Sequence, residues 1–213
     1  MIRVGVDEAG VGPAFGSLWA AAVYIPEGVR IEGLADSKKL TEKRRVRLRH
    51  EILQACHVGT GEVTQEEIDR LGLGEARRLV FDRALDSLAP RLSALPDHIV
   101  VDGTLFRPWR GVKFACLPRA HHSVPCVSAA SIIAKTERDA QVIAQCDSDP
   151  DLDARYGLRS NKGYLSKRHV EGIREHGYHA LHRRSFHIRA LDAASEAGAS
   201  SHAAAGAAVE AAV

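Results

Sequence analysis

The alternation of apolar and polar positions along the chain predicts a mixed fold of short strands and longer helices. Apolar or β-branched runs of four to eight residues, bounded by glycine or polar residues, are typical of buried strands. We expect strands at residues 2–6, 18–25, 57–63, 98–102 and 112–117. Longer stretches with apolar positions three and four residues apart favour helices. These lie at about 41–55, 75–88 and 126–146.

Two further helix starts follow from capping signals. The run Thr64-Gln65-Glu66-Glu67 has the capping-box pattern, and Gly72 is expected to break the helix that it begins. Ser166 is an expected N-cap of another helix, which stops at Gly177. The elements together predict an α/β fold, a mixed sheet flanked by helices.

Acidic residues stand where two of the predicted strands end. Asp7 and Glu8 follow the first run, and Asp102 ends the run at 98–102. Ligands of open α/β sheets bind at such carboxyl edges. Gly10 and Gly12 come next in the chain, and glycines let backbone N–H groups approach a phosphate or sugar closely. An isolated Asp-Glu pair would more often be a solvated turn, so the interpretation depends on the other acids.

The small-residue helix at 126–146 carries a further acid. Ser128, Ser131, Lys135 and Asp139 are spaced to form one polar seam along an otherwise apolar helix. Lys135 and Asp139 alone would read as a surface ion pair, whereas the seam indicates that the helix lines a cleft. With the three acids at the strand ends, Asp139 completes a set of four. Such carboxylates are typical of a site for two divalent ions of the Mg²⁺ kind.

Composition fits an enzyme of this kind. The chain has 213 residues and 45% hydrophobic content, enough for one domain with a small appendage. No stretch is long and apolar enough for a membrane span, and the first strand leaves no room for a signal peptide. The four cysteines lack C-x-x-C spacing, so we expect reduced thiols and no zinc site. We therefore expect a cytoplasmic protein.

The net charge of +2 conceals two basic segments. Residues 36–49 hold seven Lys/Arg against two acids, and residues 159–189 hold eight against two, with five histidines besides. Two basic segments beside clustered acids indicate a polyanion laid across a metal site, and nucleic acid is the expected partner. We expect a catalytic core at 1–145, a basic C-terminal segment that clamps the substrate at 146–190, and a disordered Ala/Gly/Ser-rich tail at 191–213.

Four blocks of the sequence resemble the type 2 ribonucleases H, specifically bacterial ribonuclease HII. They are Asp7 to Pro13, Gly33 to Leu40, Val127 to Asp139, and Asn161-Lys162-Gly163-Tyr164 with the later His182-Arg183-Arg184-Ser185-Phe186. The resemblance implies an RNase H-like fold with a basic helical lobe at its C-terminus. It also implies dependence on Mg²⁺ or Mn²⁺, and we expect a monomer. The implied activity is endonucleolytic cutting of RNA paired to DNA, including cutting 5′ to a single ribonucleotide in duplex DNA.

The resemblance also implies roles for individual residues. Asp7, Glu8, Asp102 and Asp139 look like the catalytic acids and metal ligands. Tyr164 looks like the tyrosine that stacks on the deoxyribose following the ribonucleotide; without the resemblance it would read equally well as a half-buried aromatic residue. The other implied substrate contacts are Gly10, Val11, Gly12, Ser37, Lys38, Lys135, Arg183 and Arg184.

The chain departs from the family pattern at two places. Val11 stands in Gly10-Val11-Gly12 where most bacterial relatives have Gly-Arg-Gly, which puts affinity and junction specificity in question more than catalysis. A family Lys-Gly-Asp stretch is Arg119-Ala120-His121 here, followed by His122, so an acid is absent. The two histidines could make a pH-sensitive contact or form a solvated turn, and we favour the turn.

Two alternatives remain on the sequence alone. An enzyme of the ribonuclease HIII type would share the acids but prefer long RNA–DNA hybrids, and it usually carries an extra N-terminal domain. A non-catalytic hybrid-binding protein would keep the basic segments but lose acids, and all four acids are present here.

Overall fold

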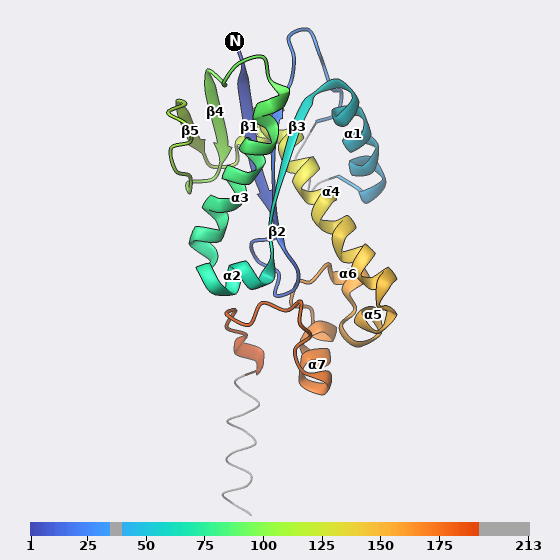
Figure 1. The fold of residues 1–213 in the computed structure, drawn as a ribbon. Helices are drawn as coiled ribbons and strands as arrows, with labels where there is room; N and C mark the ends of the chain where they lie inside the picture. The colour runs from blue at the N-terminus through green and yellow to red at the C-terminus, as the bar shows by residue number, and fades with distance from the viewer. Residues whose placement is uncertain (35–39, 192–213) are drawn as a thin grey trace, which may run out of the picture.

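The protein, described here by a computed structural model at residues 1–34 and 40–191, forms one mixed β-sheet with helices on both faces (Figure 1). Its strands are β1 (Arg3–Ala9), β2 (Leu18–Tyr24), β3 (His57–Val63), β4 (His98–Asp102) and β5 (Phe114–Leu117). The strand order is β3-β2-β1-β4-β5. β1 runs antiparallel to β2 and parallel to β4, so β1 and β4 end at the same edge of the sheet. Each strand expected from the sequence is present.

Two long helices enclose the sheet. α4 (Pro125–Ser148) packs on β1 and β2, and α3 (Leu73–Leu88) packs on β3 and β2 from the opposite face (Figure 1). α1 (Glu42–Ala55) packs against α4, and α2 (Gln65–Leu71) leads directly into α3. The expected caps are confirmed: Thr64 and Glu67 form a capping box, and the side chain of Ser166 accepts a hydrogen bond from the His169 backbone N–H.

Glycines within the strands let both helices approach closely. A Cβ at Gly5 would lie 2.3 Å from the backbone of Cys126 at the start of α4. A Cβ at Gly59 would lie 2.3 Å from the backbone nitrogen of Leu88 in α3. Any larger side chain at either position would push a helix off the sheet and open the core.

The apolar core has one layer on each face of the sheet. Val6, Leu18 and Phe81 are fully buried between the sheet and α3. Ile52 and Ile132 are fully buried between the sheet, α1 and α4. Truncating a buried aromatic such as Phe81 to alanine removes about 3–5 kcal/mol of stability, which makes these layers the rigid support of the sheet edge.

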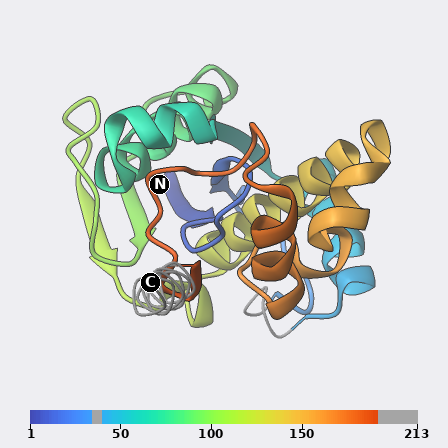
Figure 2. The ribbon, with the colours of Figure 1, turned by 90° about the horizontal axis from the view of Figure 1, so that it is seen from below.

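The C-terminal lobe, residues 149–191, contains α5 (Pro150–Tyr156), α6 (Leu158–Asn161) and α7 (Lys167–His176). Its own apolar cluster packs against the end of α4 and the segment after β1. Ala14 donates a backbone hydrogen bond to Gly163 and accepts one from Arg183, at 3.0 and 2.8 Å. Seen from below, the chain after α7 passes over this end of the sheet (Figure 2). The lobe is therefore tied to the segment that follows β1.

The structure differs from the sequence expectations in two places. β1 extends to Ala9, so Asp7 and Glu8 lie within the strand rather than after it. α5 and α6 were not expected, although Asp149 caps α5 ahead of Pro150 in a regular N-terminal arrangement. Both helices are too short to show the apolar periodicity by which a helix is recognised in a sequence.

Some expectations concern parts of the chain that the structure does not describe. Ser37, Lys38 and nearly all of the Ala/Gly/Ser-rich tail lie outside the described residues. α4 continues past residue 145 to Ser148, so no break in structure marks the expected boundary between core and C-terminal segment. Within the described ranges, no helix combines the length and apolar character that crossing a bilayer requires.

Candidate active site

Asp7 and Asp102 are brought together by the pairing of two parallel strands. The register of β1 and β4 pairs Val6 with Val101, so Asp7 and Asp102 are the next residues on neighbouring strands. β4 ends at Asp102, where the backbone turns away at Gly103, whose φ of +96° suits glycine, and β1 continues two residues further to Ala9. This is the sheet edge that the sequence predicted for the acids.

Asp7 and Glu8 point to opposite faces of the sheet because strand side chains alternate. Asp7 faces α4, where Ser131 donates a hydrogen bond to its carboxylate. Glu8 faces α3, where Arg77 Nη2 donates to its Oε1 at 2.6 Å. Both nevertheless line one pocket of about 480 Å³, since it opens at the end of the strand.

This pocket, called the active-site pocket below, gathers most of the predicted residues. Those that line it are Asp7, Glu8, Gly10, Val11, Gly12, Asp102, Lys135 and Tyr164. Arg77 and His121 line it too and were not predicted as site residues. Arg77 belongs to no motif, so the sequence held no signal for it. For His121 the signal was the missing acid of the Lys-Gly-Asp stretch.

His121 contacts Asp102 directly, so the preferred interpretation of a solvated turn is wrong for this residue. Its Nδ1 lies 2.7 Å from Asp102 Oδ2, and the His121 side chain is only 12% exposed. The other oxygen, Oδ1, accepts the Ala120 backbone N–H at 2.7 Å. Arg119, at φ +63°, turns the backbone so that both groups reach the carboxylate. His122 is the exposed member of the pair.

Burial and mutual repulsion make the charged forms of these acids costly in the protein alone. Asp7 is 6% exposed. Burial raises the pKa of its carboxyl well above the ordinary range, and the neighbouring Glu8 and Asp102 carboxylates raise it further. Burial also raises the pKa of Glu8, although the Arg77 guanidinium opposes the shift. Removing buried carboxylates from water without a counter-charge is costly, so a bound cation would stabilise this arrangement.

The donor atoms present fit a divalent metal ion. Asp7, Asp102 and His121 each offer one ligand atom, and these three atoms lie within 4.8 Å of one another. Glu8 Oε2 is buried and has no hydrogen-bond partner among the described residues. Carboxylate oxygens are the ligands that Mg²⁺ and Mn²⁺ accept. The pocket therefore has the donor set, and one unsatisfied oxygen, that a metal site requires.

Asp139 does not line the active-site pocket. Its Oδ1 accepts a hydrogen bond from Lys135 Nζ at 2.8 Å, and Arg138 and Arg45 lie 3.6 and 3.9 Å from its carboxylate. The predicted seam is thus divided: Ser131 and Lys135 reach the pocket, while Asp139 holds Lys135 from behind. Three of the four predicted acids converge, and the fourth acts on a lysine of the site.

Two buried arginines hold the loop after β1. Gly10 has φ +101°, and a Cβ there would lie 2.5 Å from Arg138 Nε, so only glycine fits. Arg183 is fully buried and donates to the carbonyls of Gly16 and Val11 at 2.8 and 3.3 Å. Burial and the nearby Arg138 lower the pKa of Arg183 to about 9. Arg183 was expected to touch substrate; in the structure it supports the loop, and the following Arg184 is exposed.

Tyr164 stands at the rim of the pocket. The residue is 45% exposed. The centre of its ring lies 5.6 Å from Lys135 Nζ and 5.7 Å from the guanidinium carbon of Arg138. A Cβ built on Gly12 would be 3.8 Å from the ring, so the loop and the ring are neighbours. The ring can thus offer a flat surface to a ligand that also touches the loop.

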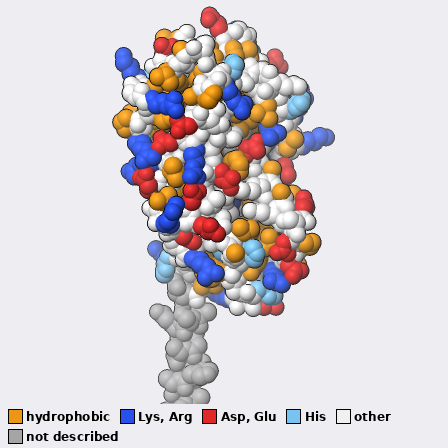
Figure 3. All heavy atoms as spheres, in the orientation of Figure 1, with side chains coloured by type: hydrophobic (Ala, Val, Ile, Leu, Met, Phe, Trp, Pro, Cys, Tyr) orange, Lys and Arg blue, Asp and Glu red, His pale blue; other side chains and the backbone are white. Residues whose placement is uncertain are grey.

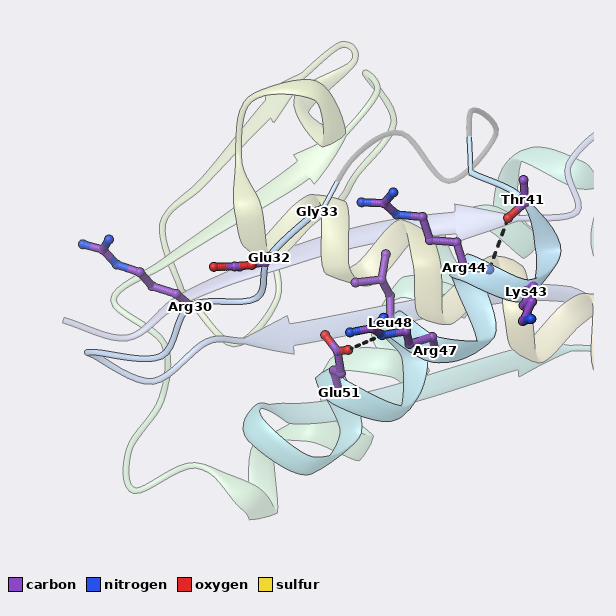
Figure 4. A pocket seen from close by; sticks show the side chains of 9 residues that line it. All are labelled: Arg30, Glu32, Gly33, Thr41, Lys43, Arg44, Arg47, Leu48 and Glu51. Atoms are coloured by element: carbon purple, nitrogen blue, oxygen red, sulfur yellow. Dashed lines mark hydrogen bonds and ion pairs between the residues drawn. The ribbon is translucent and has the colours of Figure 1, made fainter.

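Three basic residues of α1 face a second, larger pocket of about 780 Å³ (Figure 4). It is lined by Arg30, Lys43, Arg44 and Arg47, with Glu32 and Glu51 between them. Arg47 is already paired with Glu51 at 2.9 Å. No predicted acid lines this pocket.

Around α3, positive and negative side chains lie side by side rather than in separate patches (Figure 3).

The chain is similar to known proteins over most of its length. A sequence model of the family described as ribonuclease HII matches residues 4–189. Ribonuclease HII of Neisseria meningitidis serogroup C (strain 053442) is 38% identical over 187 residues, which cover 87% of this chain and 92% of that protein. Ribonuclease HII of Nitrosomonas europaea is 42% identical over 183 residues, covering 85% and 81%.

A solved structure shares the fold. Ribonuclease H2 from Pyrococcus horikoshii OT3 has a TM-score of 0.70 at 28% identity, and the match covers 87% of this chain and 94% of that one. The likeness confirms the RNase H-like mixed sheet with flanking helices that the sequence predicted.

Proposed function

Because this chain belongs to the ribonuclease HII family, and is therefore a metal-dependent endoribonuclease that acts on RNA–DNA hybrids, we propose that it also cuts 5′ to a single ribonucleotide in duplex DNA. The observation that carries the proposal is the shared pocket of Tyr164, the Gly10–Gly12 loop and the strand-end acids. These groups would contact the sugar, the 2′-OH and the scissile phosphate of one short segment of duplex. A site that reads both sugars of a junction needs these three parts together.

Tyr164 is suited to recognise the deoxyribose. Its exposed ring presents a face beside the loop, and a flat ring packs well on a sugar that lacks a 2′-OH. A ribose at the same place would bring its hydroxyl against the ring. We therefore place the nucleotide that follows the ribonucleotide on Tyr164.

The Gly10–Gly12 loop is suited to recognise the ribose. Gly10 and Gly12 expose backbone to the pocket, and backbone N–H and C=O groups can hydrogen-bond a 2′-OH. The side chain of Val11 packs toward the apolar layer under α3 and brings no charge. The proposed recognition thus depends on the backbone of the loop, which Arg183 holds by donating to the Val11 carbonyl.

We propose that Asp7, Glu8 and Asp102 hold two divalent ions, Mg²⁺ or Mn²⁺. Such ions, when bound, activate a water, neutralise the phosphate and stabilise the leaving oxygen. Arg77 occupies one oxygen of Glu8 and leaves the other for the site. Asp139 stays a predicted fourth acid, and its proposed contribution is to hold Lys135 beside the phosphate.

Three duplexes test the proposal, each assayed with Mg²⁺ and with Mn²⁺. The first is DNA with one ribonucleotide, the second is all DNA, and the third carries several consecutive ribonucleotides. We expect a cut 5′ to the lone ribonucleotide, no cut in all-DNA duplex, and a preference for the RNA–DNA junction in the third. Equal cutting throughout the ribonucleotide stretch would instead indicate a general hybrid nuclease of the HIII type. Asp7→Asn is the control for contaminating nucleases.

A further inference from the structure

We propose that the imidazole of His121 is a ligand of the metal ion in the active-site pocket, which gives the site a nitrogen donor and shifts its preference from Mg²⁺ toward Mn²⁺. This inference rests on the proposed function only in taking this pocket as the metal site. It concerns a residue outside the four acids predicted from the sequence.

The position of His121 is set by contacts that do not involve a metal. Ser128 Oγ, on α4, donates to the His121 backbone carbonyl at 2.5 Å. The neighbouring Ala120 N–H binds Asp102 Oδ1 at 2.7 Å. The turn that carries the imidazole is therefore fastened both to α4 and to the end of β4. Its ring is held over the carboxylate edge rather than in solvent.

The distances suit two ligands of one ion. His121 Nδ1 and Asp102 Oδ2 lie 2.7 Å apart, and an oxygen of Asp7 completes a set within 4.8 Å. Ligands about 2.1 Å from an octahedral ion occupy adjacent corners roughly 3 Å apart. A small increase in the distance between the two side chains is therefore enough for one ion to bind both.

A second observation points to a cation at the same place. The side chain of Glu8 is 10% exposed, and its Oε2 has no hydrogen-bond partner among the described residues. Glu8 lines the same pocket as His121, Asp7 and Asp102. A buried carboxylate oxygen without a donor is costly, and a metal ion or a water bound to one would satisfy it.

The chemistry of the donor set decides the choice of ion. Mg²⁺ is a hard ion that selects oxygen and keeps much of its water. An imidazole nitrogen favours divalent first-row transition ions over Mg²⁺, and carboxylates accept Mn²⁺ readily. A site of two aspartates and one histidine therefore binds Mn²⁺ better than an all-carboxylate site does, relative to Mg²⁺.

The test uses Mn²⁺ as its probe, because Mn²⁺ is paramagnetic. Electron spin echo spectra of the full chain with Mn²⁺ should show coupling to an imidazole ¹⁴N. The coupling should vanish in His121→Ala and His121→Asp and persist in His50→Ala, which removes an exposed histidine on α1. Calorimetric titration should show a loss of at least about tenfold in Mn²⁺ affinity for His121→Ala. His121→Asp should lower the ratio of Mn²⁺ to Mg²⁺ affinity.

The outcomes separate this inference from the proposed function. Mn²⁺ binding without ¹⁴N coupling in the wild type, or coupling that survives His121→Asp, would overturn the role of His121 while leaving junction cleavage intact. Nitrogen coupling in a protein that ignores the lone ribonucleotide would support the ligand and refute the proposed specificity. Melting temperatures of the variants identify any that are misfolded, and His121→Asp keeps a ligand of similar reach if His121→Ala unfolds.

Discussion

The imidazoles of His169 and His182 meet at their Nε2 atoms, 2.9 Å apart, in the interior of the C-terminal lobe. His169 Nδ1 lies 2.9 Å from the Tyr164 carbonyl, so that nitrogen carries a proton and donates it. His182 Nδ1 accepts the His179 backbone N–H at 2.9 Å. The one proton between the rings is therefore donated by His182, and both rings are neutral. This chain of hydrogen bonds fixes the backbone of Tyr164.

The neutral pair predicts a loss of stability in mild acid. Burial lowers the pKa of His182 to about 3 and lowers the pKa of His169 as well. Histidines of the unfolded chain titrate near pH 6.5, so between about pH 6.5 and 3 the unfolded state binds more protons. The free energy of unfolding then falls as pH drops, by about 1.4 kcal/mol per pH unit for one histidine. Urea denaturation at pH 7, 6 and 5 measures this slope.

The comparison variant for that slope is His182→Gln, which cannot take up the proton. Its free energy of unfolding should depend less on pH over this range than that of the wild type. His50→Gln, which changes an exposed histidine, should keep the wild-type slope. Equal slopes in all three proteins would contradict the buried neutral pair.

Arg183 and Arg184 should affect different properties although they are adjacent. Arg183→Ala leaves the carbonyls of Gly16 and Val11 without their buried donor, and we expect a loss of about 1–3 kcal/mol in unfolding free energy for each. Arg184→Ala should leave stability nearly unchanged. If Arg184 contacts a phosphate, its removal should flatten the log–log dependence of duplex affinity on salt by about one unit. An unchanged slope would place Arg184 away from the nucleic acid.

Tyr164 should contribute through its ring rather than its hydroxyl. Tyr164→Ala should lose roughly ten- to a hundredfold activity on a single embedded ribonucleotide, since stacking on an aromatic is worth about 1–3 kcal/mol. Tyr164→Phe keeps the ring and should stay within a few-fold of the wild type. Steady-state cleavage of one labelled duplex measures both. Similar losses in the two variants would show that the hydroxyl, not the ring face, carries the contact.

Asp7→Asn should nearly abolish cleavage while duplex binding changes only a few-fold. An amide keeps the shape of the side chain but loses the charge that holds a divalent ion. In the metal-free protein the same change removes a buried carboxyl whose pKa is raised, so it should not lower stability near neutral pH. Cleavage at saturating Mg²⁺ and thermal melting measure the two effects. Wild-type turnover of this variant would remove Asp7 from the site.

Asp139→Asn and Asp102→Asn should differ in severity. Asp102 lines the active-site pocket, whereas Asp139 reaches it only through Lys135. We expect Asp102→Asn to lose nearly all cleavage and Asp139→Asn to lose about as much as Lys135→Gln. Turnover of the three variants on one substrate decides between the two roles. A loss in Asp139→Asn as complete as that of Asp102→Asn would make Asp139 a metal ligand, as the sequence resemblance implies.

Local patterns in the chain sufficed for the elements and for part of the site. Apolar periodicity and capping act over three to eight residues, and they placed the strands and the helices with Thr64 and Ser166 at their starts. Acids at the ends of strands, followed by glycine, located Asp7 and Asp102 because neighbouring parallel strands end at one edge. The motif around Tyr164 likewise placed that residue in the pocket.

Contacts between distant parts of the chain decided the rest. Arg77 meets Glu8 across 69 positions, and Arg183 meets Val11 across 172, so neither pairing leaves a trace in local spacing. A basic residue in the sequence looks the same whether its guanidinium reaches solvent or a buried carbonyl. The spacing of α4 likewise put Asp139 on the face of Lys135, but in the fold Asp139 lines a hollow between α4 and α1, with Arg45 of α1 lying 3.9 Å from its carboxylate. Packing depends on the whole fold, and it decided which of these side chains support the backbone and which line the active-site pocket.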